Sequence, residues 1–248
     1  MEEPLTDPHR HPRTLVIVPA HNEADSIEAV LGDLRRWAAW ADVVVIDDGS
    51  SDDTAGRARA AGAATLSLAC NLGVGGAVQT GYQYAAQRGY DVAVQFDGDG
   101  QHRATQIDRL VGALSDQQAD LAVGSRLAEG VRYRFNPLRL VGNRLLSALI
   151  SGILRRRVSD PTSGFRAASG RMVHFFAAHY PQTYLGDTAE ALVWASRAKM
   201  RIVDVPTRMR QRKAGASATG SLRGFLHTLR IVVAVLVDCI EEPIKTEC

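Results

Sequence analysis

Two aspartates separated by a single glycine, Asp97 and Asp99, follow a short and largely apolar run at positions 92–96. Carboxylates at this spacing direct hard oxygen ligands at one divalent cation and leave coordination positions for phosphate oxygens and water. Mg²⁺ or Mn²⁺ bridging a diphosphate suits the arrangement. Gln101 would add an amide oxygen, and Mn²⁺ tolerates the imidazole of His102 better than Mg²⁺ does. A simple turn is the alternative interpretation, because Asp and Gly are also common turn residues.

A second acidic segment, Asp-Asp-Gly-Ser at positions 47–50, follows four hydrophobic residues at positions 43–46. The Ser-Asp-Asp triplet at positions 51–53 is suited to capping the helix that comes next. Capping does not require two further aspartates directly after an apolar strand, where a desolvated carboxylate is costly unless it binds something. We therefore expect Asp48 to accept a hydrogen bond from a nucleobase or from a ribose hydroxyl.

Glycines and arginines supply the candidate phosphate contacts. The segment Asn-Leu-Gly-Val-Gly-Gly-Ala at positions 71–77 opens a helix, where it either cradles a phosphate or lets the helix pack tightly on a strand. It lacks the spacing of a dinucleotide fingerprint and follows the third strand, not the first. Arg126 ends an apolar strand, where its guanidinium can fork onto a diphosphate. The basic segment 208–213 is either a further phosphate contact or a charged edge strand.

The elements that position these residues alternate regularly along the chain. The pattern predicts strands at 14–18, 43–46, 64–68, 92–96 and 121–123, with helices at 26–37, 53–61, 75–87 and about 105–114. Strand-helix alternation with all-apolar strands indicates an α/β fold with a mainly parallel sheet covered on both faces. Ligands bind at the carboxyl ends of such strands, so the polar segments after five strands should meet at one edge.

Composition sets the class of protein. The chain has 248 residues, of which 46% are hydrophobic and 23% charged, and this balance excludes a disordered, collagenous or coiled-coil protein. Three cysteines without metal-binding spacing predict neither a disulfide framework nor a structural metal. The N-terminus has no apolar run, which speaks against a signal peptide, and no apolar stretch approaches the ~20 residues of a membrane span. We expect a cytoplasmic protein.

Charge divides the chain into two unlike halves. Residues 1–125 contain 9 of the 29 Lys and Arg but 18 of the 27 Asp and Glu, so residues 126–248 are strongly basic. Such a half can meet anionic lipid or a phosphorylated small molecule. No nucleic-acid partner is expected, because only 6% of residues are aromatic and no recognition motif is present. The arginine-flanked apolar stretch 132–157 either lies on the inner face of a membrane or is a core helix. Helix 222–240 packs in the core or in a homodimer, or else contacts the membrane.

Six motifs, taken in order, resemble those of the family 2 glycosyltransferases, most closely the branch of dolichyl- and polyprenyl-phosphate sugar synthases. They lie at residues 16–23, 45–50, 71–77, 97–102, 124–126 and 160–166. The resemblance implies a GT-A fold, a Rossmann-like nucleotide-diphospho-sugar transferase fold, in a single domain at 14–248 after a tail at 1–13. Within it, 14–126 would bind the nucleotide sugar and metal, and 127–248 the acceptor. It also implies a GDP- or UDP-sugar donor, Mg²⁺ or Mn²⁺, and inversion at the anomeric carbon.

The resemblance also implies roles for individual residues. The nucleoside pocket would be lined by Pro19, Ala20, Glu23, Ile46 and Asp48, and the donor site would be completed by Asp97, Gly98 and Asp99. The metal would be surrounded by Asp97, Asp99 and Gln101. The donor phosphates would be held by Arg126 and Arg212. Three positions depart from the family pattern. His21 stands where tyrosine is frequent, Val74 where lysine is frequent, and Ala218 where the lipid-phosphate branch has lysine.

Two acceptor classes stay open at this point. In both, the metal and arginines, Arg126 among them, stabilise charge on the departing nucleoside diphosphate. A polyprenyl phosphate is already an anion and needs no base, whereas a hydroxyl of a glycan or glycoconjugate does. Asp187 and Glu190 are the candidate bases, or else helix N-terminal acids. The product would serve cell-envelope glycan synthesis. The alternatives from other classes are a catalytically silent nucleotide-sugar binding module and a nucleotide-dependent oxidoreductase.

Overall fold

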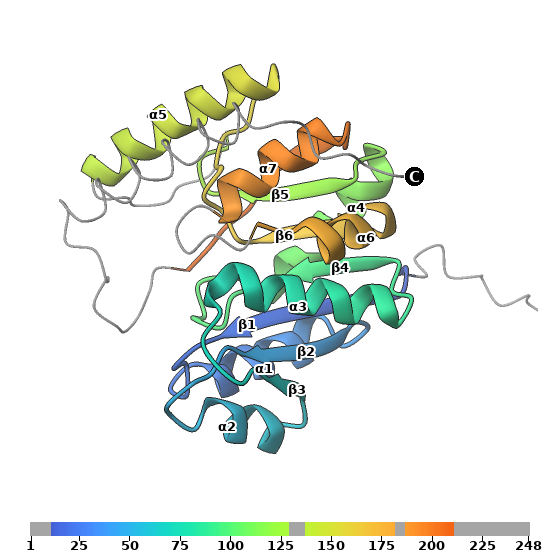
Figure 1. The fold of residues 1–248 in the computed structure, drawn as a ribbon, viewed down its shortest axis with the longest axis vertical. Helices are drawn as coiled ribbons and strands as arrows, with labels where there is room; N and C mark the ends of the chain where they lie inside the picture. The colour runs from blue at the N-terminus through green and yellow to red at the C-terminus, as the bar shows by residue number, and fades with distance from the viewer. Residues whose placement is uncertain (1–10, 129–136, 182–186, 211–248) are drawn as a thin grey trace, which may run out of the picture.

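The computed structural model describes residues 11–128, 137–181 and 187–210 (Figure 1). Its strands are β1 (Thr14–Ala20), β2 (Asp42–Asp47), β3 (Ala64–Ser67), β4 (Val92–Gln95), β5 (Leu121–Ser125), β6 (Arg166–Ser169) and β7 (Ile202–Pro206). Its helices are α1 (Ile27–Trp37), α2 (Thr54–Ala60), α3 (Gly73–Gln87), α4 (Ile107–Asp116), α5 (Pro137–Leu154), α6 (Gly170–His179) and α7 (Asp187–Arg197), with a short 3₁₀ helix at Ala104–Gln106 before α4.

The strands form one seven-stranded sheet in the order β3-β2-β1-β4-β6-β5-β7. Neighbours β1, β2, β3 and β4 pair in parallel, and β7 is parallel to β5. Only β6 runs against its neighbours, β4 and β5, among the strands that the structure describes. The carboxyl ends of β1 to β5 therefore share one edge, which confirms the prediction. The antiparallel β6 adds its amino end to the same edge.

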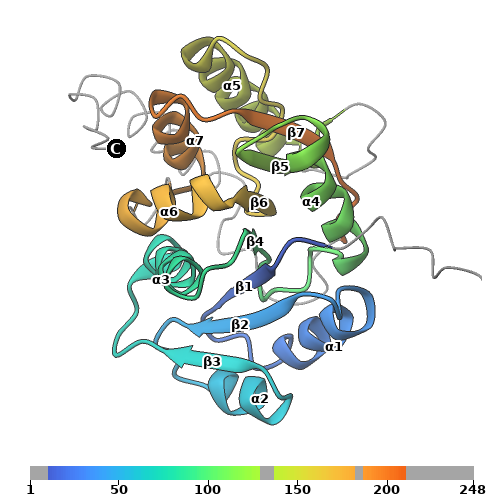
Figure 2. The same ribbon diagram turned by 90° about the vertical axis from the view of Figure 1, so that its right-hand side faces the viewer.

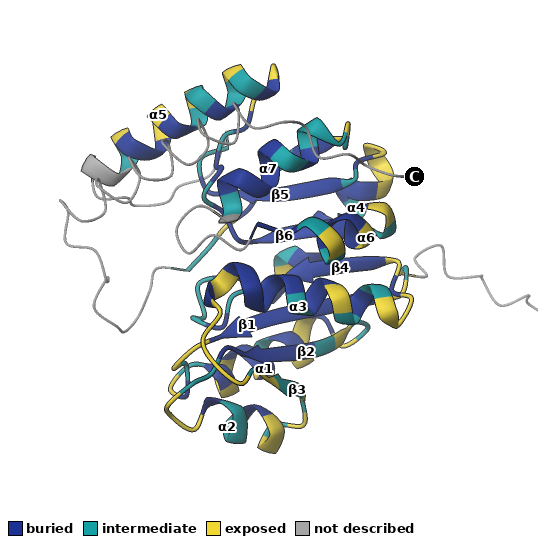
Figure 3. Cartoon of the chain, in the orientation of Figure 1, coloured by how far each residue is buried: buried dark blue, intermediate teal, exposed yellow. Residues whose placement is uncertain are grey.

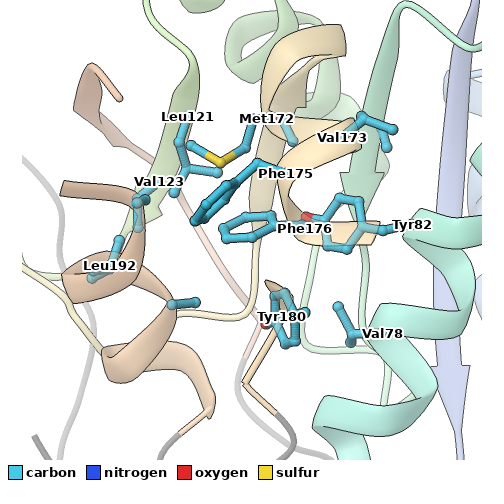
Figure 4. Packing of buried hydrophobic residues seen from close by; sticks show 14 of the residues in the cluster. Val78, Tyr82, Leu121, Val123, Met172, Val173, Phe175, Phe176, Tyr180 and Leu192 are labelled. Atoms are coloured by element: carbon cyan, nitrogen blue, oxygen red, sulfur yellow. The ribbon is translucent and has the colours of Figure 1, made fainter. Parts of the chain in front are cut away.

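Helices cover both faces of this sheet, with α3, α6 and α7 on one side and α1 and α4 on the other (Figure 2). Alternate strand residues divide between two cores: Leu15 and Ile17 face the first group of helices, whereas Val16 and Val18 face the second. Figure 4 shows the first core, where Tyr82 of α3 packs on Phe176 of α6 with ring centroids 5.1 Å apart. Burial on both faces explains why the strands read as continuous apolar runs.

The start of α2 confirms capping by the triplet 51–53 and shows which of its residues makes the hydrogen bond. Asp53 precedes the helix, but its side chain makes no capping hydrogen bond. The carboxylate of Asp52 does this work instead, since it accepts from the Thr54 amide at 3.0 Å and from the Ala24 amide at 3.1 Å. Asp52 thus fastens α2 to the segment after β1, a long-range contact that a local capping pattern does not contain.

Helix α5 is the outermost element at one end of the molecule, and exposed residues lie along it (Figure 3). Leu146, Ile150 and Leu154 are buried on its inner side. Val141 and Leu145 are 51% and 60% exposed on its outer side. The stretch is therefore a core helix on one side and an apolar surface on the other, which combines the two interpretations of the sequence. Among the described residues, no helix has the length and apolarity to span a bilayer.

Candidate functional site

A hollow of about 200 Å³ opens at the carboxyl edge of the sheet, between the ends of β1, β2 and β4 and the first turn of α3. Its described lining is Pro19, Ala20, His21, Glu23, Asp48, Val74, Ala77, Asp97, Gly98 and Asp99. Most of the residues predicted for donor binding are therefore together. Ile46 is one exception, because it lies fully buried in the core and not in the described lining. A larger hollow of about 400 Å³, at the amino ends of β1 to β3, contains none of the predicted residues in its described lining.

Asp48 lies at the wall of this hollow and is 4% exposed. Its Oδ1 accepts from the Leu72 amide at 2.7 Å, and its own amide donates to the Ala20 carbonyl at 2.9 Å. The preceding Asp47 accepts from the Ser50 amide at 3.2 Å. These backbone partners offset much of the desolvation that drew attention to both aspartates. Asp48 therefore joins β2 to the segment before α3 in addition to facing the hollow.

His21, which departs from the family pattern, is held by three hydrogen bonds. Its Nδ1 lies 2.8 Å from the Asp48 carbonyl, and its Nε2 lies 3.1 Å from both the Asn22 and Asn71 side-chain amides. Amide N–H groups only donate, so this network assigns the acceptor role to Nε2 and the proton to Nδ1. The ring is thereby fixed in the wall of the hollow, beside the end of β2.

His102 supports Asp97 and does not face the hollow, which corrects the expectation that it tunes the choice of cation as a nearby ligand. Its Nδ1 accepts from the Asp97 amide at 3.0 Å, and its Nε2 lies 3.5 Å from Asp97 Oδ2. The ring is buried and stacks on Phe165 with centroids 4.7 Å apart. Burial lowers the pKa of His102, although the nearby carboxylates oppose this shift. The neutral, buried ring therefore holds Asp97 on the side away from the hollow.

Gln101 likewise braces an aspartate. Its backbone amide donates to Asp99 Oδ1 at 3.0 Å, and its side-chain Nε2 donates to Asp99 Oδ2. Among the described residues, no group of three or more His, Cys, Asp or Glu is placed to hold a metal ion. Asp97 and Asp99 nevertheless fit a cation that draws its other ligands from a diphosphate and water, since such sites use one or two carboxylates.

Arg126 uses its planar fork on a carboxylate of the protein. Its Nε and Nη2 donate to the two oxygens of Asp160 at 2.7 and 2.9 Å, and both residues are buried. Burial by itself raises the pKa of Asp160, but the Arg126 charge and hydrogen bonds bring it below its ordinary value. Nη2 also donates to Thr162 at 3.0 Å. The fork expected for a diphosphate therefore joins the end of β5 to the segment before β6.

The remaining predicted residues lie apart from the hollow or outside the described part of the chain. Glu190 is 1% exposed on α7 and is not in the described lining. Asp187 begins α7, but its side chain is outside the described residues, as are Arg212 and Ala218. Sequence reasoning assigned no role to Asp160, Gln95 or Arg166. Asp160 and Arg166 lie in the motif at 160–166, and Gln95 is a polar residue between two apolar neighbours.

Comparisons with known proteins agree with this geometry. The family model described as Glycosyl transferase family 2 matches residues 15–180. A polyprenol monophosphomannose synthase of Mycolicibacterium smegmatis is 33% identical over 162 residues, which are 62% of this chain and 61% of that protein. An undecaprenyl-phosphate mannosyltransferase of Micrococcus luteus is 32% identical over 212 residues, which are 83% of this chain and 86% of that protein.

Solved structures share the fold at lower identity. Glucosyl-3-phosphoglycerate synthase of Mycobacterium tuberculosis, in complex with phosphoglyceric acid, has a TM-score of 0.72 at 22% identity and covers 93% of this chain and 81% of that one. The same enzyme in complex with Mn²⁺, uridine diphosphate and glucosyl-3-phosphoglycerate has a TM-score of 0.70 at 23% identity, with the same coverage of both chains. The chain therefore has the GT-A fold that its motifs imply.

Proposed function

The chain belongs to glycosyl transferase family 2, whose model matches residues 15–180, and from this premise we propose that it moves a sugar from a nucleotide-diphosphate sugar onto a polyprenyl phosphate. It is a glycosyltransferase, so the oxidoreductase interpretation of the glycine-rich segment is wrong. The observation that carries the proposal is the hollow where Asp48 meets Asp97 and Asp99. The lipid acceptor is supported by the names of two relatives, a polyprenol monophosphomannose synthase and an undecaprenyl-phosphate mannosyltransferase.

The donor would lie across this hollow with its nucleoside toward β1 and β2. Pro19 and Ala20 supply apolar wall there, and Asp48 supplies a carboxylate for a ribose or base N–H or O–H group. The amide of Gly98 donates to the Pro19 carbonyl at 3.3 Å, which draws the segment carrying the two metal-site aspartates against the end of β1. Nucleoside and diphosphate subsites are thereby adjacent, as a UDP- or GDP-sugar requires.

Asp97 and Asp99 are the residues that would hold Mg²⁺ or Mn²⁺. A cation held there supplies charge stabilisation to the departing nucleoside diphosphate. The chain itself keeps both carboxylates in place, because Gln101 donates twice to Asp99 and His102 accepts from the Asp97 amide. Preorganised groups of this kind lower the barrier without rearranging during the reaction. The acceptor attacks the anomeric carbon from the side opposite the leaving group, with inversion.

A lipid phosphate suits the buried state of Glu190. Such an acceptor is an anion at neutral pH, so no general base is needed, and a carboxylate with 1% exposure is poorly placed to serve as one. The test compares acceptors: Glu190→Gln and Asp187→Asn should each retain most transfer to polyprenyl phosphate. Loss of ~10²-fold or more in turnover with donor affinity kept, together with transfer to a hydroxyl acceptor only, contradicts the proposal.

Contact with a membrane surface completes the proposal, because the acceptor lipid is anchored there. The outer side of α5 carries Val141, Leu145, Ala148 and Gly152 as exposed residues four, three and four positions apart, which places them on one helical face. Arg144 and the three arginines at 155–157 are exposed around this face. An apolar stripe rimmed by arginines is typical of a helix that lies in the headgroup region of an anionic leaflet.

The donor is identified by binding. Thermal unfolding of the protein would be followed with UDP- and GDP-sugars, each with and without Mn²⁺, because a ligand that binds the folded state raises the midpoint. We expect one nucleotide to stabilise the protein strongly only when Mn²⁺ is present. Incubation of that donor with polyprenyl phosphate should then yield a glycosylated lipid. Release of free sugar alone, or no stabilisation by any nucleotide sugar, contradicts the proposal.

A further inference from the structure

Two buried polar side chains behind the hollow have atoms that no hydrogen bond satisfies among the described residues. They are Oε1 of Gln95 on β4 and Nη1 of Arg166 on β6. Gln95 is 1% exposed and Arg166 is fully buried. Because nearly all buried polar groups in proteins are paired, two such groups on neighbouring strands call for an explanation. None of the motifs that describe the donor site gives them a role.

Arg166 ties together the chain around the acceptor side of the sheet. Its Nε donates to the Ser163 carbonyl at 2.8 Å and its Nη2 to the Thr188 carbonyl at 2.6 Å, in the first turn of α7. The positive charge also reaches α3, because it opposes the rise that burial causes in the pKa of Tyr82. In the weakly polarisable interior, a guanidinium acts strongly on neighbouring dipoles.

Gln95 lies opposite Arg166 in the sheet and contacts the Asp97 carboxylate. Gln95 and Arg166 are directly opposite partners in the antiparallel pair of β4 and β6, so their side chains leave the sheet on the same face. The Nε2 of Gln95 lies 3.5 Å from Asp97 Oδ1 and donates to it. The carboxamide thus turns its N–H end to the carboxylate, and its oxygen is the end left for a cationic donor.

Gly164 encloses this arrangement from the segment before β6. A Cβ at this position would lie 3.0 Å from both carboxylate oxygens of Asp97 and 3.1 Å from Nε2 of Gln95. Such distances are shorter than ordinary van der Waals contact, so any larger residue would press on both side chains. The backbone at Gly164 therefore keeps the carboxylate and the carboxamide side by side.

We propose that Gln95 and Arg166 are positioning residues that fix the Asp97 carboxylate for cation and diphosphate binding, with Arg166 acting through the Gln95 carboxamide. No hydrogen bond joins the two side chains, so the buried guanidinium charge on the paired strand acts on the carboxamide dipole through space and strengthens its N–H donor toward Asp97. The inference rests on the proposed function, in which Asp97 holds the cation. It adds two residues on strands β4 and β6 that touch neither the donor nor the acceptor.

The first test replaces Gln95 by methionine, which keeps the side-chain length and removes both polar ends. Gln79→Met is the matched control, since Gln79 is also buried but donates to the Ala177 carbonyl on α6. Calorimetry would measure UDP binding with and without Mn²⁺, and thermal unfolding would measure stability. We expect Gln95→Met to weaken the Mn²⁺-dependent binding about tenfold, as is typical when a group that orients a metal ligand is lost. Binding without Mn²⁺ should stay unchanged in both variants.

The second test asks whether Arg166 acts through Gln95. Arg166→Met should weaken Mn²⁺-dependent binding by a similar factor, and the double variant should bind no more weakly than Gln95→Met alone. Additive losses of affinity in the double variant would overturn the role of Arg166. If Arg166→Met does not fold, Arg166→Lys is used in its place. Wild-type affinity for Mn²⁺ and UDP in Gln95→Met overturns the whole inference. If the unaltered protein shows no Mn²⁺-dependent binding of any nucleotide, the proposed function fails, and this inference fails with it.

Discussion

At the scale of single residues, Asp97 and Asp99, the two aspartates proposed to hold the cation, are held by different means. Asp99 is braced by the backbone and side-chain amides of Gln101, its neighbour two positions along the chain. Asp97 is held by His102 and by Gln95 from the preceding strand. Local contacts therefore place Asp99, whereas the buried interior places Asp97. Substitutions at the two positions should differ accordingly in their effect on the fold.

Asp99→Ala is expected to abolish Mn²⁺-dependent donor binding and leave the midpoint of thermal unfolding within about 2 °C of the wild-type value. The side chain lies at the rim of the hollow and not in a core, so its removal creates no cavity. Calorimetric titration of the donor with and without Mn²⁺ measures the effect. Asp116→Ala, at an exposed carboxylate on α4, is the control. Donor affinity equal to that of the wild type would remove Asp99 from the metal site.

Asp48→Asn should weaken nucleotide binding about tenfold or more, both with and without Mn²⁺, because it removes a charged acceptor for the ribose or base. Asparagine retains an oxygen for the Leu72 amide, so the segment before α3 should stay in place. Asp48→Ala loses this bond as well and should lower the free energy of unfolding by about 1–3 kcal/mol. Binding is measured by calorimetry and stability by urea unfolding. A change confined to the Mn²⁺-dependent part of the affinity would show that Asp48 has another role.

At the scale of elements, the buried pair of Arg126 and Asp160 joins the end of β5 to the segment that leads into β6. Strand β6 is short, with four residues paired to β4 and three to β5, and its antiparallel direction breaks the run of parallel strands. The pair therefore stabilises the place where the two halves of the sheet meet. Removing one partner leaves the other charge buried without compensation.

Asp160→Asn should lower the free energy of unfolding by about 3–5 kcal/mol, as is typical when one partner of a buried pair is removed. Urea unfolding at neutral pH measures this loss. Arg171→Met is the matched control, because Arg171 pairs with Asp120 at the surface and should contribute no more than about 1 kcal/mol. Equal losses in the two variants would contradict the stabilising role of the buried pair.

The same pair makes stability depend on pH in acid. The folded pKa of Asp160 lies below its ordinary value of 3.8, so the unfolded chain takes up the proton first as the pH falls. The contribution of Asp160 is therefore complete above about pH 5 and is lost as the pH falls through 3.8 toward the folded pKa. Unfolding midpoints measured between pH 6 and about pH 3 should fall less steeply for Asp160→Asn than for the wild type. Parallel curves would contradict this assignment.

At the scale of the whole molecule, α5 combines exposed apolar residues with exposed arginines, Arg144 and those at 155–157. Residues 126–248 carry 20 of the 29 Lys and Arg, and α5, within that half, is the outermost element at one end of the fold. Its exposed apolar face lies far from α1, which is at the other end of the molecule in both views (Figures 1 and 2). The molecule thus has one end suited to an anionic surface.

Leu145→Glu should reduce binding to vesicles that contain anionic lipid about tenfold, since it removes the most exposed large apolar side chain among the described residues of α5 and adds a negative charge. Co-sedimentation with vesicles of phosphatidylglycerol and phosphatidylcholine measures the effect. The control is Trp37→Glu, which changes an exposed apolar residue at the end of α1 in the same way. Binding of the wild type should weaken with added salt. Failure of the wild type to bind such vesicles contradicts the proposed membrane contact.

The helices and strands of the first half, and the sheet edge at which they present polar residues, could be predicted from the amino-acid pattern. Apolar runs such as 43–46 show buried strands directly, and parallel strands necessarily share an edge for their carboxyl ends. Strand β6 gave no comparable signal, because Arg166–Ser169 is short and contains an arginine and two alanines. Its antiparallel direction could not be inferred from periodicity.

The partners of the buried polar groups could be identified only from the three-dimensional arrangement of the chain. Arg126 was expected to face a diphosphate, but it binds Asp160, 34 positions along the chain. His102 was considered beside the cation, but it supports Asp97, and Gln95 faces Arg166 across two paired strands. The partners of Arg126 and Gln95 could not be predicted because they are distant along the chain. Periodicity records which face of an element is buried, whereas the partner of a buried charge depends on which distant segment comes within about 3 Å of it.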